Sequence, residues 1–76
     1  MKKIILPRLG ETMEQGIIVK WLINEGEHFK RGQILVEIES DKTTIELPAL
    51  QEGKLKEILK KNGEVADIGE TIATFN

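Results

Sequence analysis

The sequence predicts an all-β fold, a flattened β-sandwich or barrel of two antiparallel sheets organised by an internal pseudo-two-fold repeat. Residues 16–38 align with residues 53–75 without a gap, at a constant offset of 37. Apolar side chains alternate with polar ones in short segments separated by glycines, as in half-buried strands. Each copy is too small to bury its own apolar face, so we expect the two copies to pack against each other.

Three pairs of glycines coincide in this alignment: Gly16 with Gly53, Gly26 with Gly63, and Gly32 with Gly69. Glycine adopts a positive φ angle without a steric penalty, so we expect turns with positive φ at all three pairs. Glu27 also coincides with Glu64. The repeat therefore predicts the same backbone path in both copies.

Upstream of Gly16 the repeat continues with a different offset. Residues 4–9 resemble residues 45–50 around a shared Leu-Pro pair, at an offset of 41, which gives the first copy four extra residues. An insertion in one copy is not required by the shared fold, so it is a candidate recognition loop. The four extra residues lie within the loop of Gly10, Glu11, Thr12, Met13, Glu14 and Gln15, which corresponds to only Gln51 and Glu52 in the second copy.

The predicted strands follow from apolar residues that alternate by two, and these residues also form the predicted core. They are Ile4 and Leu6, Val36 and Ile38, Ile45 and Leu47, and Ala73 and Phe75, with Ile18, Trp21, Leu55 and Ile58 added from the repeat. Residues 16–23 are rich in β-branched side chains and predict a further strand. His28 coincides with Val65 and is expected at a surface strand or turn.

Residues 53–63 give conflicting signals. Leu55, Ile58 and Leu59 have helical spacing, and Gly63 could cap a helix at its C-terminus. The repeat partner of this segment, residues 16–26, begins as a strand. Because both copies should share one fold, we expect a strand whose β-bulge accounts for the spacing of three.

Length and composition exclude several classes of function. The 76 residues are expected to form one domain, 1–76, without a large substrate cleft. Cysteine is absent and His28 is the single histidine, so no disulfide framework or zinc site is expected. The net charge is −2 with both signs scattered, which argues against nucleic-acid binding.

The apolar run near the N-terminus, residues 4–7, is too short for a signal peptide or a membrane span. We therefore expect no membrane association. Bacterial cytoplasm is the expected location, because no transit peptide is seen, and the mitochondrial matrix is the alternative.

The midpoint of the chain has the composition of a tight hairpin turn, Ser40-Asp41-Lys42-Thr43. Lys42 should project from its tip, and the repeat places this tip at the opposite end of the domain from both termini. Exposed turns often carry Asp and Lys for solubility, and charge alone does not select Lys42 among nine lysines.

Several segments together carry a family resemblance. They are residues 6–16 (Leu-Pro-Arg-Leu-Gly-Glu-Thr-Met-Glu-Gln-Gly), Trp21-Leu22, Glu25-Gly26-Glu27, Gly32-Gln33 and, above all, residues 37–44 (Glu-Ile-Glu-Ser-Asp-Lys-Thr-Thr). Through them, residues 6–76 resemble the lipoyl domains of 2-oxo acid dehydrogenase acyltransferases, which have the lipoyl/biotinyl fold. Thr12-Met13 is similar to the pyruvate and acetoin dehydrogenase types.

The resemblance implies a non-catalytic carrier with no metal. Lipoic acid would be amide-linked to Lys42, with Asp41 and Thr43 as flanking recognition residues and the Gly10–Gln15 loop nearby as a partner-recognition element. The lipoyl group would act as a swinging arm. The implied partners are a lipoate ligase or lipoyl/octanoyl transferase, a thiamine-dependent 2-oxo acid decarboxylase, an acyltransferase catalytic domain and dihydrolipoamide dehydrogenase.

Two alternatives stay open. Biotin carrier domains share the fold and modify a lysine at the same tip, but methionines flank that lysine, whereas Asp41 and Thr43 flank Lys42 here. The second alternative is an unmodified β-sandwich that serves only as an interaction module.

Overall fold

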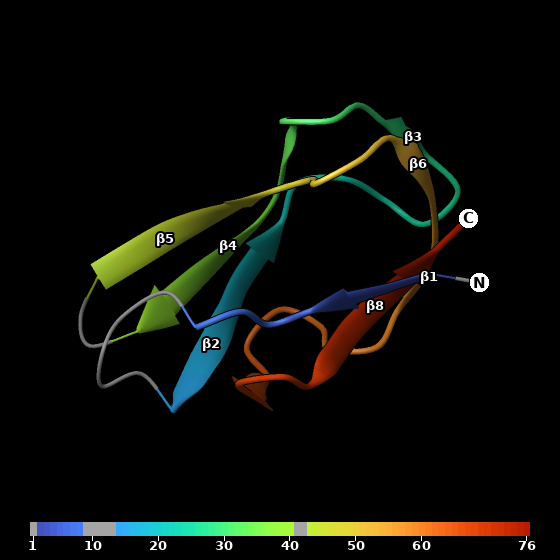
Figure 1. Cartoon of the computed structure of the whole chain (residues 1–76). Coiled ribbons are helices and arrows are strands. Elements are labelled where there is room, and N and C mark those ends of the chain that lie inside the picture. Colours follow the sequence, from blue (N-terminus) through green and yellow to red (C-terminus); the bar gives the residue numbers. More distant parts are fainter. Residues whose placement is uncertain (1, 9–13, 41–42) are drawn as a thin grey trace.

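The computed structural model describes residues 2–8, 14–40 and 43–76, and these residues form eight strands and no helix (Figure 1). The strands are β1 (Lys2–Ile5), β2 (Gln15–Trp21), β3 (His28–Phe29), β4 (Ile34–Ser40), β5 (Thr43–Pro48), β6 (Gly53–Ile58), β7 (Val65–Asp67) and β8 (Thr71–Phe75). The predicted all-β class is confirmed. None of the described segments is a helix long and apolar enough to cross a lipid bilayer.

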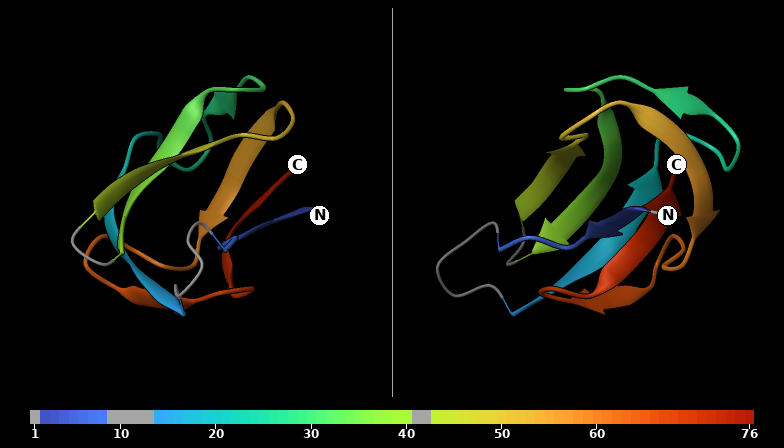
Figure 2. Two further views of the ribbon diagram at one scale, coloured as in Figure 1. Left: turned by 60° about the vertical axis from the view of Figure 1, so that its left-hand side comes forward. Right: turned by 45° about the vertical axis from the view of Figure 1, so that its right-hand side comes forward.

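Two four-stranded antiparallel sheets face each other across a common interior (Figure 2). Sheet 1 has the strand order β1-β8-β6-β3, and sheet 2 has the order β5-β4-β2-β7. The repeat relates β1–β4 to β5–β8, and exchanging the two copies converts one strand order into the other. Each copy contributes two strands to each sheet, so the copies are intertwined and neither forms a sheet alone.

Backbone hydrogen bonds between the copies occur in equivalent pairs. Gly26 N donates to Leu55 O at 2.7 Å, and Gly63 N donates to Ile18 O at 2.6 Å. Donors and acceptors are both related by the offset of 37. The internal repeat of the sequence is therefore a true pseudo-symmetry of the backbone.

The shared glutamates have the same structural role in both copies. Asn24 N donates to Glu27 Oε1 at 2.6 Å, and Lys61 N donates to Glu64 Oε1 at 2.7 Å. Each carboxylate closes its own turn by satisfying a backbone donor three residues earlier, where no strand partner is available.

The register of the sheets resolves the conflict over residues 53–63. β6 is a strand, and its pairing with β8 shifts between Leu55 and Glu57. β2 shifts at the equivalent place, between Ile18 and Lys20, in its pairing with β4. The prediction of a strand with a β-bulge is confirmed, and the extra residue of the bulge produces the spacing that resembles a helix.

The predicted offset of 41 for the N-terminal strand is wrong. Gly69 N donates to Leu6 O and Gly32 N donates to Ala49 O, both at 2.8 Å. Because Gly32 and Gly69 are equivalent, Leu6 corresponds to Ala49 at an offset of 43, and the first copy has six extra residues instead of four. The alignment on the shared Leu-Pro pair matched Leu6 with Leu47 because the residue types agree. The equivalent glycine amides, however, donate to the carbonyl groups of Leu6 and Ala49.

Positive φ is confirmed for two of the three glycine pairs: Gly26 (91°), Gly63 (89°), Gly32 (87°) and Gly69 (86°). Gly16 and Gly53 lie inside β2 and β6, so the expectation of a turn is wrong for this pair. At Gly53 the requirement is space. A Cβ atom there would lie 2.6 Å from Phe75 Cδ2 and 2.8 Å from the Asn76 carbonyl oxygen.

The core lies between the two sheets. Most of its predicted members are buried: Leu6, Ile18, Trp21, Val36, Ile38, Leu47, Leu55, Ala73 and Phe75. Ile4 and Ile58 pack against this core while partly buried, and Ile45 is half-buried outside it. Ile4 and Ile45 lie on the edge strands β1 and β5, which have a neighbouring strand on one side only.

Alternation by two missed other buried residues. Leu35 and Ile72 are the extra residues at two further equivalent register shifts, so each is buried directly beside a second buried residue, Val36 or Ala73. The core also contains Ile23 and Ala49, which extend the alternation of Trp21 and of Leu47 by one step, and Phe29 and Ala66, which lie in the short strands β3 and β7. A periodic pattern does not show where a bulge interrupts it.

The contacts around Gly53 predict that Gly53→Ala destabilises the fold by about 1–3 kcal/mol, as expected for overpacking. The Asn76 carbonyl cannot move aside easily, because Lys54 N donates to it at 3.0 Å. Urea unfolding measures the effect. The neighbouring exposed substitution Glu52→Ala is the control, with an expected change within about 0.5 kcal/mol. Equal unfolding midpoints for the two variants would contradict the close approach.

A partly exposed ion pair joins Lys60 Nζ to Glu70 Oε2 at 3.1 Å. The pKa of Glu70 is lowered, first by the hydrogen bond from Asp67 N and then by the one from Lys60. The pKa of Lys60 is raised, mainly by its hydrogen bond to Glu70. At the equivalent position of the first copy, Gln33 Oε1 accepts from Lys30 N at 3.1 Å without a charge.

This arrangement predicts the effect of Glu70→Gln on the pH dependence of stability. The unfolded chain binds the Glu70 proton more tightly, so the contribution of this carboxylate is present at neutral pH and is lost as the pH falls through the lowered pKa. Because Gln retains the acceptor, the variant should lose less stability than the wild type between about pH 6 and pH 3. Urea unfolding at a series of pH values tests this, and parallel curves would count against it.

Candidate functional site

The end of the domain where β4 meets β5 is the pole on which the sequence prediction centred. Ser40 pairs with Thr43, so the two strands stay in register up to the residues that precede and follow positions 41 and 42. Asp41 and Lys42 themselves lie outside the described residues. Thr43 is exposed at the start of β5. Figure 1 shows the end of β4 and the start of β5 at the opposite side of the domain from both termini, as the repeat predicts.

The predicted recognition loop approaches this pole through its last residue. Ser40 Oγ donates to the Gln15 carbonyl oxygen at 3.4 Å, a long contact that places the start of β2 beside the end of β4. Gln15 Nε2 donates to Asp67 Oδ1 at 2.9 Å, and Ile68 N donates to the Glu14 carbonyl oxygen at 3.1 Å. The second copy thus holds the end of the loop on β7. Gly10, Glu11, Thr12 and Met13 lie outside the described residues.

Carboxylates follow the outer face of sheet 2 near the pole. Glu37 lies opposite Glu46 on β5 and opposite Lys20 on β2, while Glu39 lies opposite Thr44. These residues are spread along strand pairs instead of converging on one point. Among the described residues, no group of three or more His, Cys, Asp or Glu side chains is arranged to hold a metal ion.

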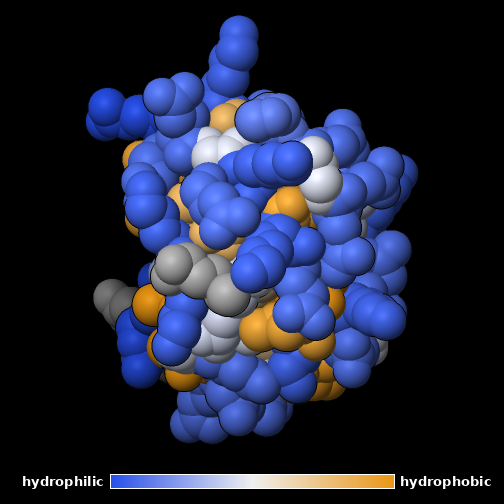
Figure 3. Space-filling model, turned by 90° about the vertical axis from the view of Figure 1, so that its right-hand side faces the viewer, coloured by the Kyte–Doolittle hydropathy of each residue, from blue (hydrophilic) through white to orange (hydrophobic). Residues whose placement is uncertain are grey.

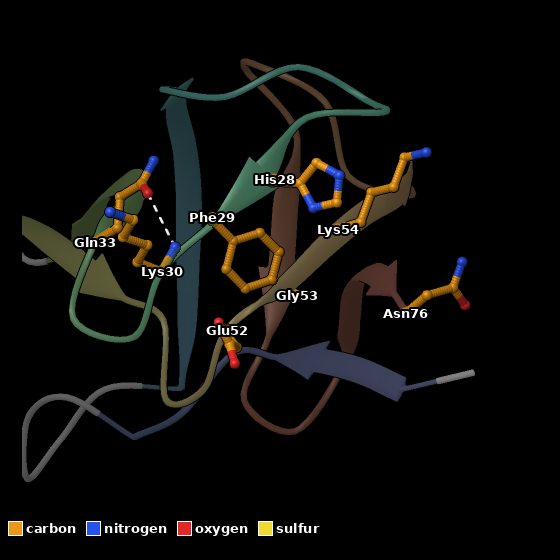
Figure 4. A pocket seen from close by; sticks show the side chains of 8 residues that line it. All are labelled: His28, Phe29, Lys30, Gln33, Glu52, Gly53, Lys54 and Asn76. Carbon is orange, nitrogen blue, oxygen red and sulfur yellow. Dashed lines mark hydrogen bonds between the residues drawn. The ribbon is translucent and has the colours of Figure 1, made fainter.

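Two of the open hollows on the described surface lie away from Ser40 and Thr43. The first, of about 380 Å³, lies beside the C-terminus between β3 and β6 (Figure 4) and is lined by His28, Phe29, Lys30, Gln33, Glu52, Gly53, Lys54 and Asn76. His28 is exposed there, as predicted. The second, of about 620 Å³, is lined by Trp21, Ile23, Asn24, Glu25, Ile58, Lys61 and Asn62.

The second hollow has a structural role. Its members include three repeat pairs, Trp21 with Ile58, Asn24 with Lys61 and Glu25 with Asn62, so it lies where the copies meet. The Trp21 indole Nε1 donates to the Lys60 carbonyl oxygen at 2.7 Å, which satisfies the polar atom of a buried aromatic side chain.

Comparison with known proteins agrees with this geometry. The model of the biotin and lipoyl family, described as "Biotin-requiring enzyme", matches residues 2–75. The solved lipoyl domain of the 2-oxoglutarate dehydrogenase complex from Azotobacter vinelandii superimposes with a TM-score of 0.81 at 30% identity, covering 100% of this chain and 96% of that one. The chain belongs to this family as a lipoyl domain. It is a non-catalytic carrier domain.

Longer relatives contain a segment similar to this lipoyl domain. The succinyltransferase component of the 2-oxoglutarate dehydrogenase complex of Bacillus subtilis is 38% identical over 76 residues, which is 100% of this chain and 18% of the relative. The pyruvate dehydrogenase complex protein X component of Saccharomyces cerevisiae is 43% identical over 74 residues, which is 96% of this chain and 18% of the relative. The chain therefore spans less than a fifth of these relatives.

Proposed function

We propose that this domain carries lipoic acid in amide linkage to Lys42, and that the resulting swinging arm transfers acyl groups and reducing equivalents within a 2-oxo acid dehydrogenase complex. The observation that carries the proposal is the sequence Asp41-Lys42 between the paired residues Ser40 and Thr43, in a fold shared with a solved lipoyl domain. The relatives that match are components of such complexes.

The surroundings of the pole fit a group that must leave the domain to react. β4 and β5 stay paired up to Ser40 and Thr43, and Thr43 is exposed. A carrier needs a firm covalent anchor and free access, whereas a binding pocket would hold the group back. When bound, the lipoyl group supplies a dithiolane that accepts an acyl group together with two electrons.

Attachment requires the side chain of Lys42 as a nucleophile. The neutral amine attacks the carbonyl carbon of an activated lipoyl or octanoyl group, the amide C–N bond forms as the bond to the leaving group breaks, and one amine proton passes to a base. A lysine of ordinary pKa is mostly protonated at neutral pH, so the attaching enzyme must accept that proton. The domain is the substrate of a lipoate ligase or lipoyl/octanoyl transferase, with Asp41 and Thr43 as flanking recognition residues.

After attachment, the proposed partners are a thiamine-dependent decarboxylase, an acyltransferase catalytic domain and dihydrolipoamide dehydrogenase. A covalent tether keeps the reacting group at high effective concentration near these enzymes and prevents its loss by diffusion. The Gly10–Gln15 loop is the proposed element for recognition of the cognate decarboxylase, since its last residue lies beside Ser40.

The choice of complex and compartment belongs to the same proposal. Thr12-Met13 favours a pyruvate or acetoin type, while matching relatives come from both pyruvate and 2-oxoglutarate complexes. Bacterial cytoplasm is the proposed location, with the mitochondrial matrix as the alternative.

The proposed attachment predicts that co-expression with a bacterial lipoate ligase in the presence of lipoic acid adds the mass of one lipoyl group. Peptide mapping should place this group on Lys42. Co-expression with a biotin ligase and biotin is the matched control and should leave the mass unchanged. Biotin addition would favour the biotin carrier. If neither ligase changes the mass of the domain, the result would favour the unmodified interaction module.

The proposal also predicts that Lys42→Arg abolishes modification, because a guanidinium cannot form the lipoyl amide. The substitution keeps the charge, so the free energy of unfolding should change by no more than about 0.5 kcal/mol. Lys20→Arg, on the outer face of sheet 2, is the control that should leave modification intact. Marked unfolding of the Lys42 variant would show that this lysine has a structural role.

A further inference from the structure

The outer faces of the two sheets have equivalent backbones and different chemistry. On sheet 2, Ile17 lies between Val65 of β7 and Glu39 of β4 in the strand register. Ile17 is 41% exposed, Val65 46% and Val19, in the β2 bulge, 41%. These three residues, here called the apolar stripe, leave branched hydrocarbon side chains in contact with water.

The pseudo-symmetry supplies an internal comparison for the stripe. The positions equivalent to Ile17, Val19 and Val65 are Lys54, Lys56 and His28, which are also exposed. Lys54 and His28 lie opposite each other between β6 and β3, as Ile17 and Val65 do between β2 and β7 (Figure 4). The same backbone therefore accepts three basic side chains, so the fold does not require apolar residues in the stripe.

Two other exposed apolar residues, Leu22 and Leu59, behave differently. Leu22 and Leu59 are equivalent to each other and are both exposed, so an apolar residue occurs there in both copies. A shared feature of this kind is explained by the common fold. The stripe differs because its apolar character is confined to one of the two equivalent faces.

The charges around the stripe also distinguish the two faces. Carboxylates lie near it: Glu37 and Glu39 on β4 and Asp67 on β7, with Glu46 one strand further away on β5 and the basic Lys20 on β2. On sheet 1, Lys30 occupies the position equivalent to Asp67, and Lys3 lies on β1 where Glu46 lies on β5. The end of the molecule that carries the termini is covered mostly by hydrophilic residues (Figure 3).

The position of the stripe bears on how one lysine is selected. The row that contains Val65, Ile17, Glu39 and Thr44 lies one residue inside the Ser40–Thr43 pair. Before modification the domain carries no lipoyl group and has nine lysines. The attaching enzyme can therefore select one lysine only by recognising the protein surface. The two faces share the backbone of the paired strands, so within the sheets they differ in side-chain chemistry.

We propose that the apolar stripe is the surface on which the lipoate-attaching enzyme docks, through an apolar patch of its own bordered by basic side chains. This inference rests on the proposed function of Lys42. The stripe provides the apolar contact, the surrounding carboxylates orient the basic partner, and the basic residues at the equivalent positions of sheet 1 repel it from the wrong face.

The test compares two double variants of the whole domain as substrates of a bacterial lipoate ligase with lipoic acid and ATP. Ile17→Thr with Val65→Thr removes the apolar contact and keeps β-branched side chains suited to a strand. Lys54→Thr with His28→Thr is the matched control at the equivalent positions. Intact-mass time courses at several domain concentrations give kcat and KM, and urea unfolding checks that each variant is folded.

We expect the stripe variant to lose about tenfold in kcat/KM, through a higher KM at unchanged kcat, as for loss of a central apolar contact. The control should stay within about twofold of the wild type. If the stripe variant unfolds, a second variant with Ile17→Lys and Val65→His should show the same loss. These are the residue types that the fold accepts at the equivalent positions, Lys54 and His28.

Equal kcat/KM values for the stripe variant and the wild type would overturn the docking surface while leaving Lys42 as the attachment site. Equal losses in the stripe and control variants would also overturn it, since the effect would not be specific to one face. A wild-type domain that the ligase does not modify would instead remove the proposed function, and the docking surface with it.

Discussion

The interleaving of two sequence copies into both sheets is the constraint on which the rest of the structure depends. Gly26 N reaches Leu55 O and Gly63 N reaches Ile18 O, so each copy satisfies backbone groups of the other. Neither copy has a sheet of its own, and the core between β2, β4, β6 and β8 closes only when both are present. A chain of 76 residues without disulfides thereby obtains one continuous core.

The same constraint creates a carrier with two distinct ends. The β4–β5 junction and the chain termini occupy equivalent positions at opposite poles, so a group attached at one pole can reach partners without obstruction from whatever joins the other. Surface side chains then remove the equivalence. Ile17 and Val65 lie beside the end of β4 at the first pole, whereas Lys54 and His28 lie beside the C-terminus at the second.

Bulges explain why this small domain departs from simple patterns. The equivalent register shifts after Ile18 and Leu55 turn a strand into a segment with apparent helical spacing. Those beside Leu35 and Ile72 bury two neighbouring residues in succession. The repeat still led to the correct assignment of strand, because an irregularity that occurs in both copies belongs to the fold and not to chance.

The sequence by itself determined the all-β class, the pairing of the two copies, most of the core and the pattern Asp41-Lys42-Thr43, because periodicity and repetition are local and can be read along the chain. Only the tertiary structure decided the offset of 43 for β1, the requirement for glycine at position 53, and the approach of Gln15 to Ser40. Each of these depends on which atoms meet across the sheets. The repeat already set Ile17 against Lys54 in the sequence, but strand pairing was needed to place Ile17 beside Val65 on one exposed face near the pole.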